Sequence, residues 1–120
     1  MRGGTVVRFS LTTLGLACAT ALGAAPIAAQ APDGQAIYRE ECRNCHGAAG
    51  KPTQRALSQY KKIPTLDATF LATRSQDSIV AVLHHGLGKD MKSFKDKLSP
   101  EEIAAVARYV RETFGTAAKP

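Results

Sequence analysis

The chain has 120 residues, with 16 lysine and arginine residues against 10 aspartate and glutamate residues, and a formal net charge of +6. This length predicts one small domain. A hydrophobic content of 44% and a mean hydropathy of −0.15 exclude a polytopic membrane protein and a wholly disordered chain. The basic residues form no dense stripe with aromatic partners, so we expect no nucleic-acid partner.

Residues 1–29 have the pattern of a secretory signal peptide. Two arginines near the start are followed by an apolar run over residues 9–22 and then by small residues. This order matches the charged, apolar and cleavage regions of such signals. We place the cleavage after Ala29, which leaves residues 30–120 as a single mature domain.

The same segment has two other interpretations. An uncleaved membrane anchor would need about 20 apolar residues, which is more than this run supplies. Lipid attachment at Cys18 is the other interpretation, although Gly15 stands where a lipobox has leucine.

The two cysteines beyond the signal lie in the sequence Cys42-Arg43-Asn44-Cys45-His46. This C-x-x-C-H pattern is typical of c-type haem attachment. Positions i, i+3 and i+4 of a helix share one stripe, so both thiols would face the haem vinyl groups while the imidazole reaches the iron. Because c-type haem is attached outside the bacterial cytoplasmic membrane, the export signal agrees with this interpretation, and we place the protein in the periplasm.

Three alternatives use the same cysteines. A zinc site would recruit His84 or His85, but the chain lacks a second C-x-x-C and the H-x₃₋₅-H spacing. A thioredoxin-like redox motif would follow a strand, whereas residues 33–41 have a helical pattern. A structural disulfide would suit an oxidising compartment, but so short a loop gives poor geometry and little entropic gain.

The mature chain resembles the class I monohaem c-type cytochromes over nearly its whole length. The positions that carry the resemblance are Gly34, Tyr38, residues 42–47, 63–66, Gly86, 91–94 and 98–103. The resemblance implies an all-α, cytochrome c-like fold of about four short helices around one covalently bound haem c. Lys92 departs from the family, in which many members have proline after the methionine ligand.

A second axial ligand is expected opposite His46, since cytochromes that carry electrons generally keep six-coordinate iron. Met91 is the only methionine left after the signal, and it lies in a loop of glycine and charged residues that could drape across the ring. His84 and His85 are the rivals, and their other interpretation is capping of a helix C-terminus. We therefore predict His46 and Met91 as the iron ligands.

The resemblance also implies a role for Pro64. Its carbonyl would accept a hydrogen bond from the other ring nitrogen of His46 and fix the imidazole. A simple turn-forming proline explains this residue equally well.

The final helix has the clearest signals. Ser99 is a predicted N-cap, with Pro100 at the first helical position and Glu102 completing a capping box, and Gly115 ends the helix. Its apolar stripe must be buried, and the resemblance implies a close crossing with a helix over residues 34–45.

Smaller signals fill the rest of the chain. Tyr38 and Tyr109 are predicted packing residues at the helix crossing. Asp67 and Ser75 are predicted N-caps of two further helices, and residues 47–51 are expected in a surface loop.

These features predict an exported electron-transfer protein that is not an enzyme. The alternative is a fixed haem subunit of a larger periplasmic or membrane-associated oxidoreductase. A third interpretation is an enzyme or gas sensor with an open iron position.

Met91 is surrounded by lysines at positions 89, 92, 95 and 97, whose charge is partly offset by Asp90 and Asp96. They predict docking to acidic surfaces of redox partner proteins, and a merely solvated face is the simpler reading. We expect a monomer that meets a membrane only through a partner complex.

Overall fold

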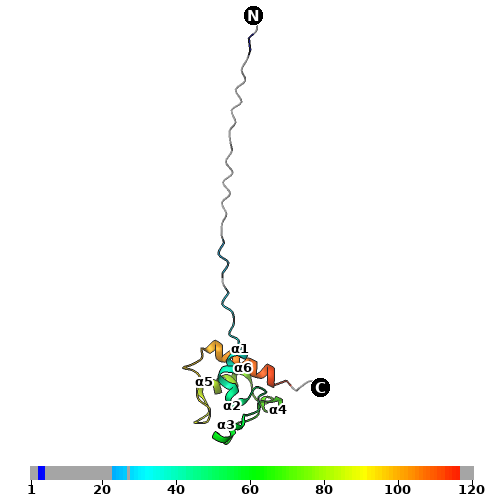
Figure 1. Cartoon of the computed structure of the whole chain (residues 1–120), viewed down its shortest axis with the longest axis vertical. Helices are drawn as coiled ribbons and strands as arrows, with labels where there is room; N and C mark the ends of the chain where they lie inside the picture. Colours follow the sequence, from blue (N-terminus) through cyan, green and yellow to red (C-terminus); the bar gives the residue numbers. More distant parts are fainter. Residues whose placement is uncertain (1–2, 5–22, 27, 117–120) are drawn as a thin grey trace.

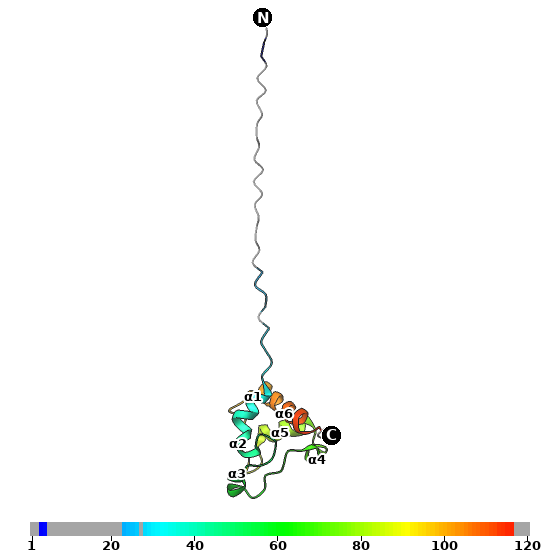
Figure 2. The ribbon, with the colours of Figure 1, turned by 45° about the vertical axis from the view of Figure 1, so that its right-hand side comes forward.

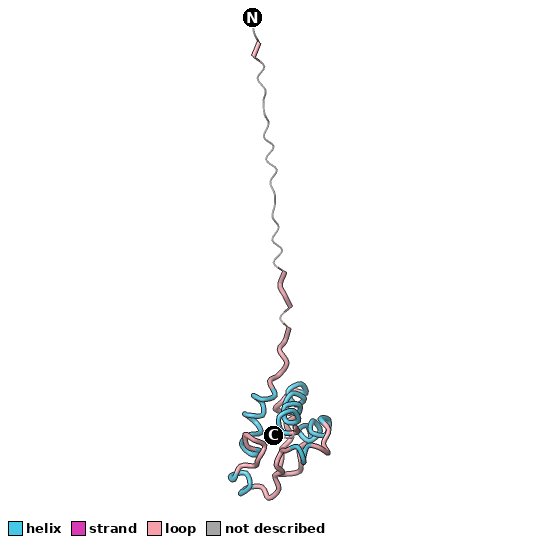
Figure 3. The backbone as a smooth tube through the Cα atoms, turned by 90° about the vertical axis from the view of Figure 1, so that its right-hand side faces the viewer, coloured by secondary structure: helices cyan, strands magenta, loops and turns pink. Residues whose placement is uncertain are grey.

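The computed structural model describes residues 3–4, 23–26 and 28–116. The apolar run of the predicted signal peptide and Cys18 lie outside these residues. The described part consists of helices and loops (Figure 3), without a strand and with one isolated bridge between Leu87 and Met91. The predicted all-α class is therefore confirmed. None of its helices combines the length and the apolar character needed to cross a bilayer.

The chain begins its fold with one helical run that contains a π-helical turn. The run consists of α1 (Gly34–Ile37), the π-helical turn η1 (Tyr38–Cys42) and α2 (Arg43–His46). Four more helices follow (Figure 1): α3 (Gln54–Gln59), α4 (Ala68–Leu71), α5 (Gln76–His85) and α6 (Pro100–Phe114).

The predicted caps of α6 are present. The Ser99 hydroxyl accepts a hydrogen bond from the Glu102 amide at 3.2 Å, and the Glu102 carboxylate accepts one from the Ser99 amide at 2.8 Å. The capping box satisfies amides that have no partner within the helix, so the start predicted for this helix is confirmed.

Two internal caps are also confirmed. Asp67 accepts from the amide of Phe70 at 2.8 Å and starts α4, and Ser75 accepts from the amide of Ser78 at 3.1 Å and starts α5. The sequence analysis missed α3. Its N-cap is Thr53, and it buries only Ala56, so it lacks the apolar stripe by which a helix is recognised.

The hydrophobic core lies where α6 meets the helices that precede it. Figures 1 and 2 show α6 beside α1 and close to α5, in agreement with the contacts between these elements. The buried core cluster consists of Tyr38, Cys42, Leu71, Leu83, Ile103, Val106, Ala107 and Val110. Because Cys42 belongs to this cluster, the C-x-x-C-H motif is anchored in the core.

Gly34 permits the close crossing of α1 and α6. A Cβ atom at this position would overlap the backbone carbonyl of Ala105 and crowd the Cβ atom of Tyr109. Backbone atoms cannot move aside as a flexible side chain does, so glycine is required for this helix separation. The close crossing implied by the resemblance is present.

We expect Gly34→Ala to lower the free energy of unfolding by about 2 kcal/mol, because the added methyl group overpacks the crossing. For a domain of this size, that loss lowers Tm by roughly 10 °C. Thermal unfolding of the purified protein, followed by circular dichroism, measures the effect. The control is Gln35→Ala at an exposed position of the same turn, and equal stability of the two variants would contradict the prediction.

Candidate functional site

The three chemical groups of the C-x-x-C-H motif lie within two successive turns of one helical run. Cys42 ends the π-helical turn, in which the amide of Arg43 donates to the carbonyl of Tyr38. Cys45 and His46 belong to α2, which ends at Gly47 with φ of 73°. The three residues thus lie on one helical run, although the π-helical turn at Cys42 departs from the regular helix on which the predicted shared stripe depends.

Both cysteines are free thiols in this structure. Cys42 is 7% exposed, and burial raises its pKa to about 12, with further contributions from the charges of Glu41 and Cys45. Cys42 is therefore a buried, neutral thiol within the core cluster.

His46 is a half-buried imidazole with an unsatisfied nitrogen. Burial lowers the pKa of His46, so the ring is neutral at pH 7 and can act as a ligand through nitrogen. Its Nδ1 atom is buried without a hydrogen-bond partner. Buried polar atoms of this kind are rare unless a partner belongs to the site, and the imidazole therefore fits a group that is bound there.

The expectation that the Pro64 carbonyl accepts from His46 is wrong for this structure. Nδ1 of His46 has no partner, and Pro64 is exposed. The segment is held one turn further on, where the amide of Leu66 donates to the carbonyl of Gly50 at 2.8 Å. The structure shows no hydrogen-bonded turn at Pro64 either.

Thr53 closes the C-terminal end of the motif helix. Its hydroxyl donates to the carbonyl of Asn44 at 2.8 Å, and its amide donates to the carbonyl of Cys45 at 3.1 Å. The same hydroxyl accepts from the amide of Ala56 and so caps α3. One side chain therefore fixes the ends of two helices beside the second cysteine, a role that the sequence analysis missed.

Met91 ends a tight turn whose other residues are exposed. The amide of Leu87 donates to the Met91 carbonyl at 2.8 Å, and the reverse hydrogen bond measures 3.4 Å. Gly88 within the turn has φ of 57°. The Met91 side chain is partly buried and packs against the cluster that includes Cys42.

The rival ligands His84 and His85 are exposed at the end of α5, with ring centroids 4.7 Å apart. The C-terminus of α5 is capped by other groups: the amide of Gly86 donates to the carbonyl of Val82, and the hydroxyl of Ser93 donates to the carbonyl of His84. Capping by the two imidazoles was the wrong expectation, because backbone and serine donors already satisfy these carbonyls.

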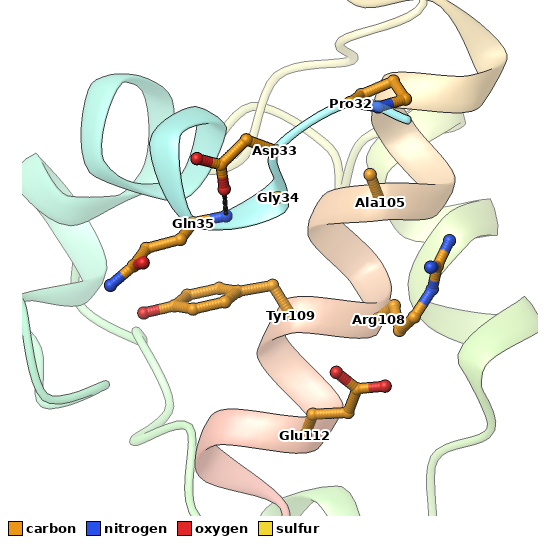
Figure 4. A pocket seen from close by; sticks show the side chains of 8 residues that line it. All are labelled: Pro32, Asp33, Gly34, Gln35, Ala105, Arg108, Tyr109 and Glu112. Carbon is orange, nitrogen blue, oxygen red and sulfur yellow. Dashed lines mark hydrogen bonds between the residues drawn. The ribbon is translucent and has the colours of Figure 1, made fainter. Parts of the chain in front are cut away.

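Two surface cavities lie near the helical run. The first, of about 310 Å³, is lined by Asn44, Cys45, Arg55, Ala56 and Gln59 and therefore adjoins the second cysteine. The second, of about 210 Å³, lies between the start of α1 and α6 (Figure 4), where the Asp33 carboxylate caps α1 near the Tyr109 ring. It contains no residue of the motif.

No described feature of the structure supports a zinc site, a thioredoxin-like motif or a structural disulfide at these cysteines. Across residues 3–4, 23–26 and 28–116, no group of three or more histidine, cysteine or acidic side chains is placed to hold a metal ion. No strand precedes the motif in this part of the chain, and its cysteines are not joined.

Comparison with known proteins assigns the family. Residues 29–110 match the family described as cytochrome C oxidase, cbb3-type, subunit III. The chain is 36% identical to a cytochrome c6 of Nostoc sp. over 85% of its own length and 88% of that protein. The chain belongs to the c-type cytochrome family.

Other relatives agree. A cytochrome c6 of Microcystis aeruginosa is 36% identical over 65% of this chain and 90% of its own length. The solved structure of the c-type cytochrome KustC0563 has a TM-score of 0.62 at 33% identity, covering 69% of this chain and 99% of that one. A nitrite reductase of Stutzerimonas stutzeri is 32% identical over 86% of this chain, which spans only 19% of that enzyme.

The chain is thus a monohaem electron-transfer cytochrome with covalently bound haem c. Its residues fit this group, because they supply two unpaired thiols, a neutral imidazole with an orphaned buried nitrogen and a half-buried thioether. All four border one apolar cluster or lie on the helical run that enters it.

Tyr38 connects the core to the end of the motif. Its hydroxyl donates to the carbonyl of Gly47 at 2.8 Å, and burial raises the pKa of Tyr38, with contributions from Cys42 and Tyr109. The hydroxyl therefore stays protonated and remains a donor.

We expect Tyr38→Phe to destabilise the protein by about 1 kcal/mol, because the Gly47 carbonyl loses the shorter of its two hydrogen bonds and keeps the 3.4 Å bond from the Gly50 amide. Urea denaturation of the haem-containing protein measures the change. Tyr109→Phe removes a hydroxyl from the same aromatic cluster without touching Gly47 and is the control. Equal losses in the two variants would show that the Tyr38 hydrogen bond contributes nothing specific.

Proposed function

We propose that this chain is an exported carrier of single electrons whose haem is attached through Cys42 and Cys45 and whose iron is held by His46 and Met91. The observation that supports it most directly is the packing of Met91 against the same buried cluster that contains Cys42. The bound haem supplies the one-electron chemistry of ferrous and ferric iron.

The chain's own residues hold this group without a chemical step on the protein. His46 presents a neutral imidazole because burial disfavours its charged form. Met91 presents a thioether from a turn closed by two backbone hydrogen bonds. A methionine ligand favours ferrous iron more than a second imidazole does, so this ligand pair gives a comparatively oxidising carrier.

Export to the periplasm is part of the proposal. It is supported by the basic start, the apolar run over residues 9–22 and the small residues before Ala29. Attachment of haem c outside the cytoplasmic membrane requires the same route.

Electron exchange takes place with redox partner proteins, and we assign their docking to a lysine face near Met91. Lys89, Lys92 and Lys95 are exposed there, beside Leu87, which is 58% exposed. An apolar contact rimmed by positive charge suits a small, transient interface with an acidic partner. The chain acts as a monomer and reaches a membrane only through such a partner.

Replacing the proposed sulfur ligand tests the site. In Met91→Ala we expect the sulfur-to-ferric-iron absorption band to disappear and the ferrous protein to bind carbon monoxide, because one iron position loses its ligand. Leu87→Ala, in the same turn, should keep the band and stay unreactive. A Met91→Ala protein that retains the band would show that the axial assignment is wrong.

Reversing charge on the lysine face tests the docking surface. We expect Lys89→Glu and Lys92→Glu each to slow reduction of hexacyanoferrate(III) by roughly two- to fivefold at low salt, because the anion is no longer attracted. Added salt should reduce the difference. Arg108→Glu, which changes charge at the cavity beside Tyr109, is the control. An equal fall in the reduction rate of the control would show that the lysine face has no special role in docking.

A second function is favoured by two of the comparisons. The matching family is named for a subunit of an oxidase, and the nitrite reductase contains a segment similar to this whole domain. Service as a fixed haem subunit of a larger oxidoreductase would give the same site. Co-purification from the native host and gel filtration separate the two functions: a free carrier elutes alone, and a subunit elutes with its complex.

A further inference from the structure

One ion pair connects the helical run of the motif to the segment that follows Met91. Lys97 Nζ lies 2.6 Å from Glu41 Oε2, across 56 positions of sequence. Glu41 directly precedes Cys42. The Glu41 side chain is only 17% exposed, whereas that of Lys97 is 64% exposed. A lysine that reaches from the surface therefore neutralises a largely buried carboxylate beside the first cysteine.

The rest of the Met91 segment is fixed to α5 instead. The turn at Met91 closes on Leu87, and the hydroxyl of Ser93 donates to the carbonyl of His84 at 2.5 Å. The amide of Phe94 donates to the carbonyl of Leu83 at 2.8 Å. The bonds to His84 and Leu83 order the segment relative to α5, and none of the named bonds fixes it relative to the motif.

Of the side-chain hydrogen bonds in the part of the chain that the structure describes, the Lys97–Glu41 bond is the one that joins residues 87–98 to residues 34–46. Phe94 and Leu98 add apolar contact with the core cluster. A short charge-assisted hydrogen bond adds to this apolar packing. The pair therefore gives the segment a polar attachment to the motif helix in addition to its apolar contacts.

We propose that Glu41 and Lys97 are positioning residues that keep the Met91 thioether in place opposite His46. This inference rests on the proposed function, since it concerns the same iron ligand. The pair acts through the five residues that connect Met91 to Lys97.

The proposal also separates Lys97 from the docking face. Lys89, Lys92 and Lys95 have no ion pair with the described acidic residues, whereas Lys97 is already paired. The four lysines of this segment therefore have two roles, docking and ion pairing. Removing the charge of Lys97 should change the imidazole affinity, whereas removing the charge of Lys95 should not.

Competition by an added ligand measures how firmly Met91 is held. Imidazole is titrated into the ferric haem-containing protein at fixed pH and low salt, and loss of the sulfur-to-ferric-iron band is followed. We expect Lys97→Met to bind imidazole about three- to fivefold more tightly than the unchanged protein, as for the loss of a partly exposed ion pair. Lys95→Met is the matched control and should bind as the unchanged protein does.

Three further variants make the test specific to the pair. Glu41→Gln should raise imidazole affinity as Lys97→Met does. The double variant should show no additional increase, because both changes remove one interaction. Lys97→Arg keeps the positive charge and should bind imidazole with the affinity of the unchanged protein. Salt should raise imidazole affinity in the unchanged protein and have little effect in the double variant.

Equal imidazole affinities of Lys97→Met and Lys95→Met, or additive effects in the double variant, would overturn the inference alone. Two other results would overturn the proposed function instead. The unchanged protein would lack the sulfur-to-ferric-iron band, or Met91→Ala would bind imidazole no more tightly than the unchanged protein binds it. The salt effect in the unchanged protein needs no variant, so the inference stays testable if Glu41→Gln does not fold.

Discussion

The close contact between α1 and α6 is the constraint on which the rest of the structure depends. The two helices can approach because Gly34 has no side chain where the Ala105 carbonyl lies. That approach brings Tyr38 against Tyr109 and Phe114, with ring centroids 5.4 and 5.2 Å apart. Aromatic pairs at such distances contribute more than their buried area alone. They also fix the helical run that leads directly into the haem motif.

Two residues of the site, Cys42 and Met91, depend on this core packing. Cys42 belongs to the core cluster, and Met91 packs against it from another part of the chain. A mature domain of this size supplies few apolar side chains, so a large flat apolar group is a natural complement to the cluster. The family assignment agrees with this view, because it implies that one covalently attached group serves both as redox centre and as part of the interior.

The sequence predicted those features that local chemistry determines. The capping box of Ser99 and Glu102, the caps at Asp67 and Ser75 and the motif spacing are signals written in neighbouring residues. Features that depend on residues far apart in the chain were not predicted from the sequence. The short helix α3 buries almost no apolar surface, and the ion pair of Glu41 and Lys97 joins segments 56 positions apart.

The wrong expectations have the same origin. The carbonyls at the end of α5 were assigned to the adjacent imidazoles, but the hydroxyl of Ser93, nine residues away, satisfies one of them. Pro64 was assigned a hydrogen bond by analogy, and the position of a carbonyl relative to a distant ring depends on the whole path of the intervening chain.

The π-helical turn at Tyr38–Cys42 gives the motif helix a freedom that a regular helix lacks. One surplus residue in a turn shifts all later side chains by about 100° around the axis. The turn thus sets the angle between the α1 face that meets α6 and the later residues Cys45 and His46, whereas Cys42 stays in the core cluster. The one extra residue of the π-helical turn therefore sets the angle between the side chains that face the interior and those that face the cofactor.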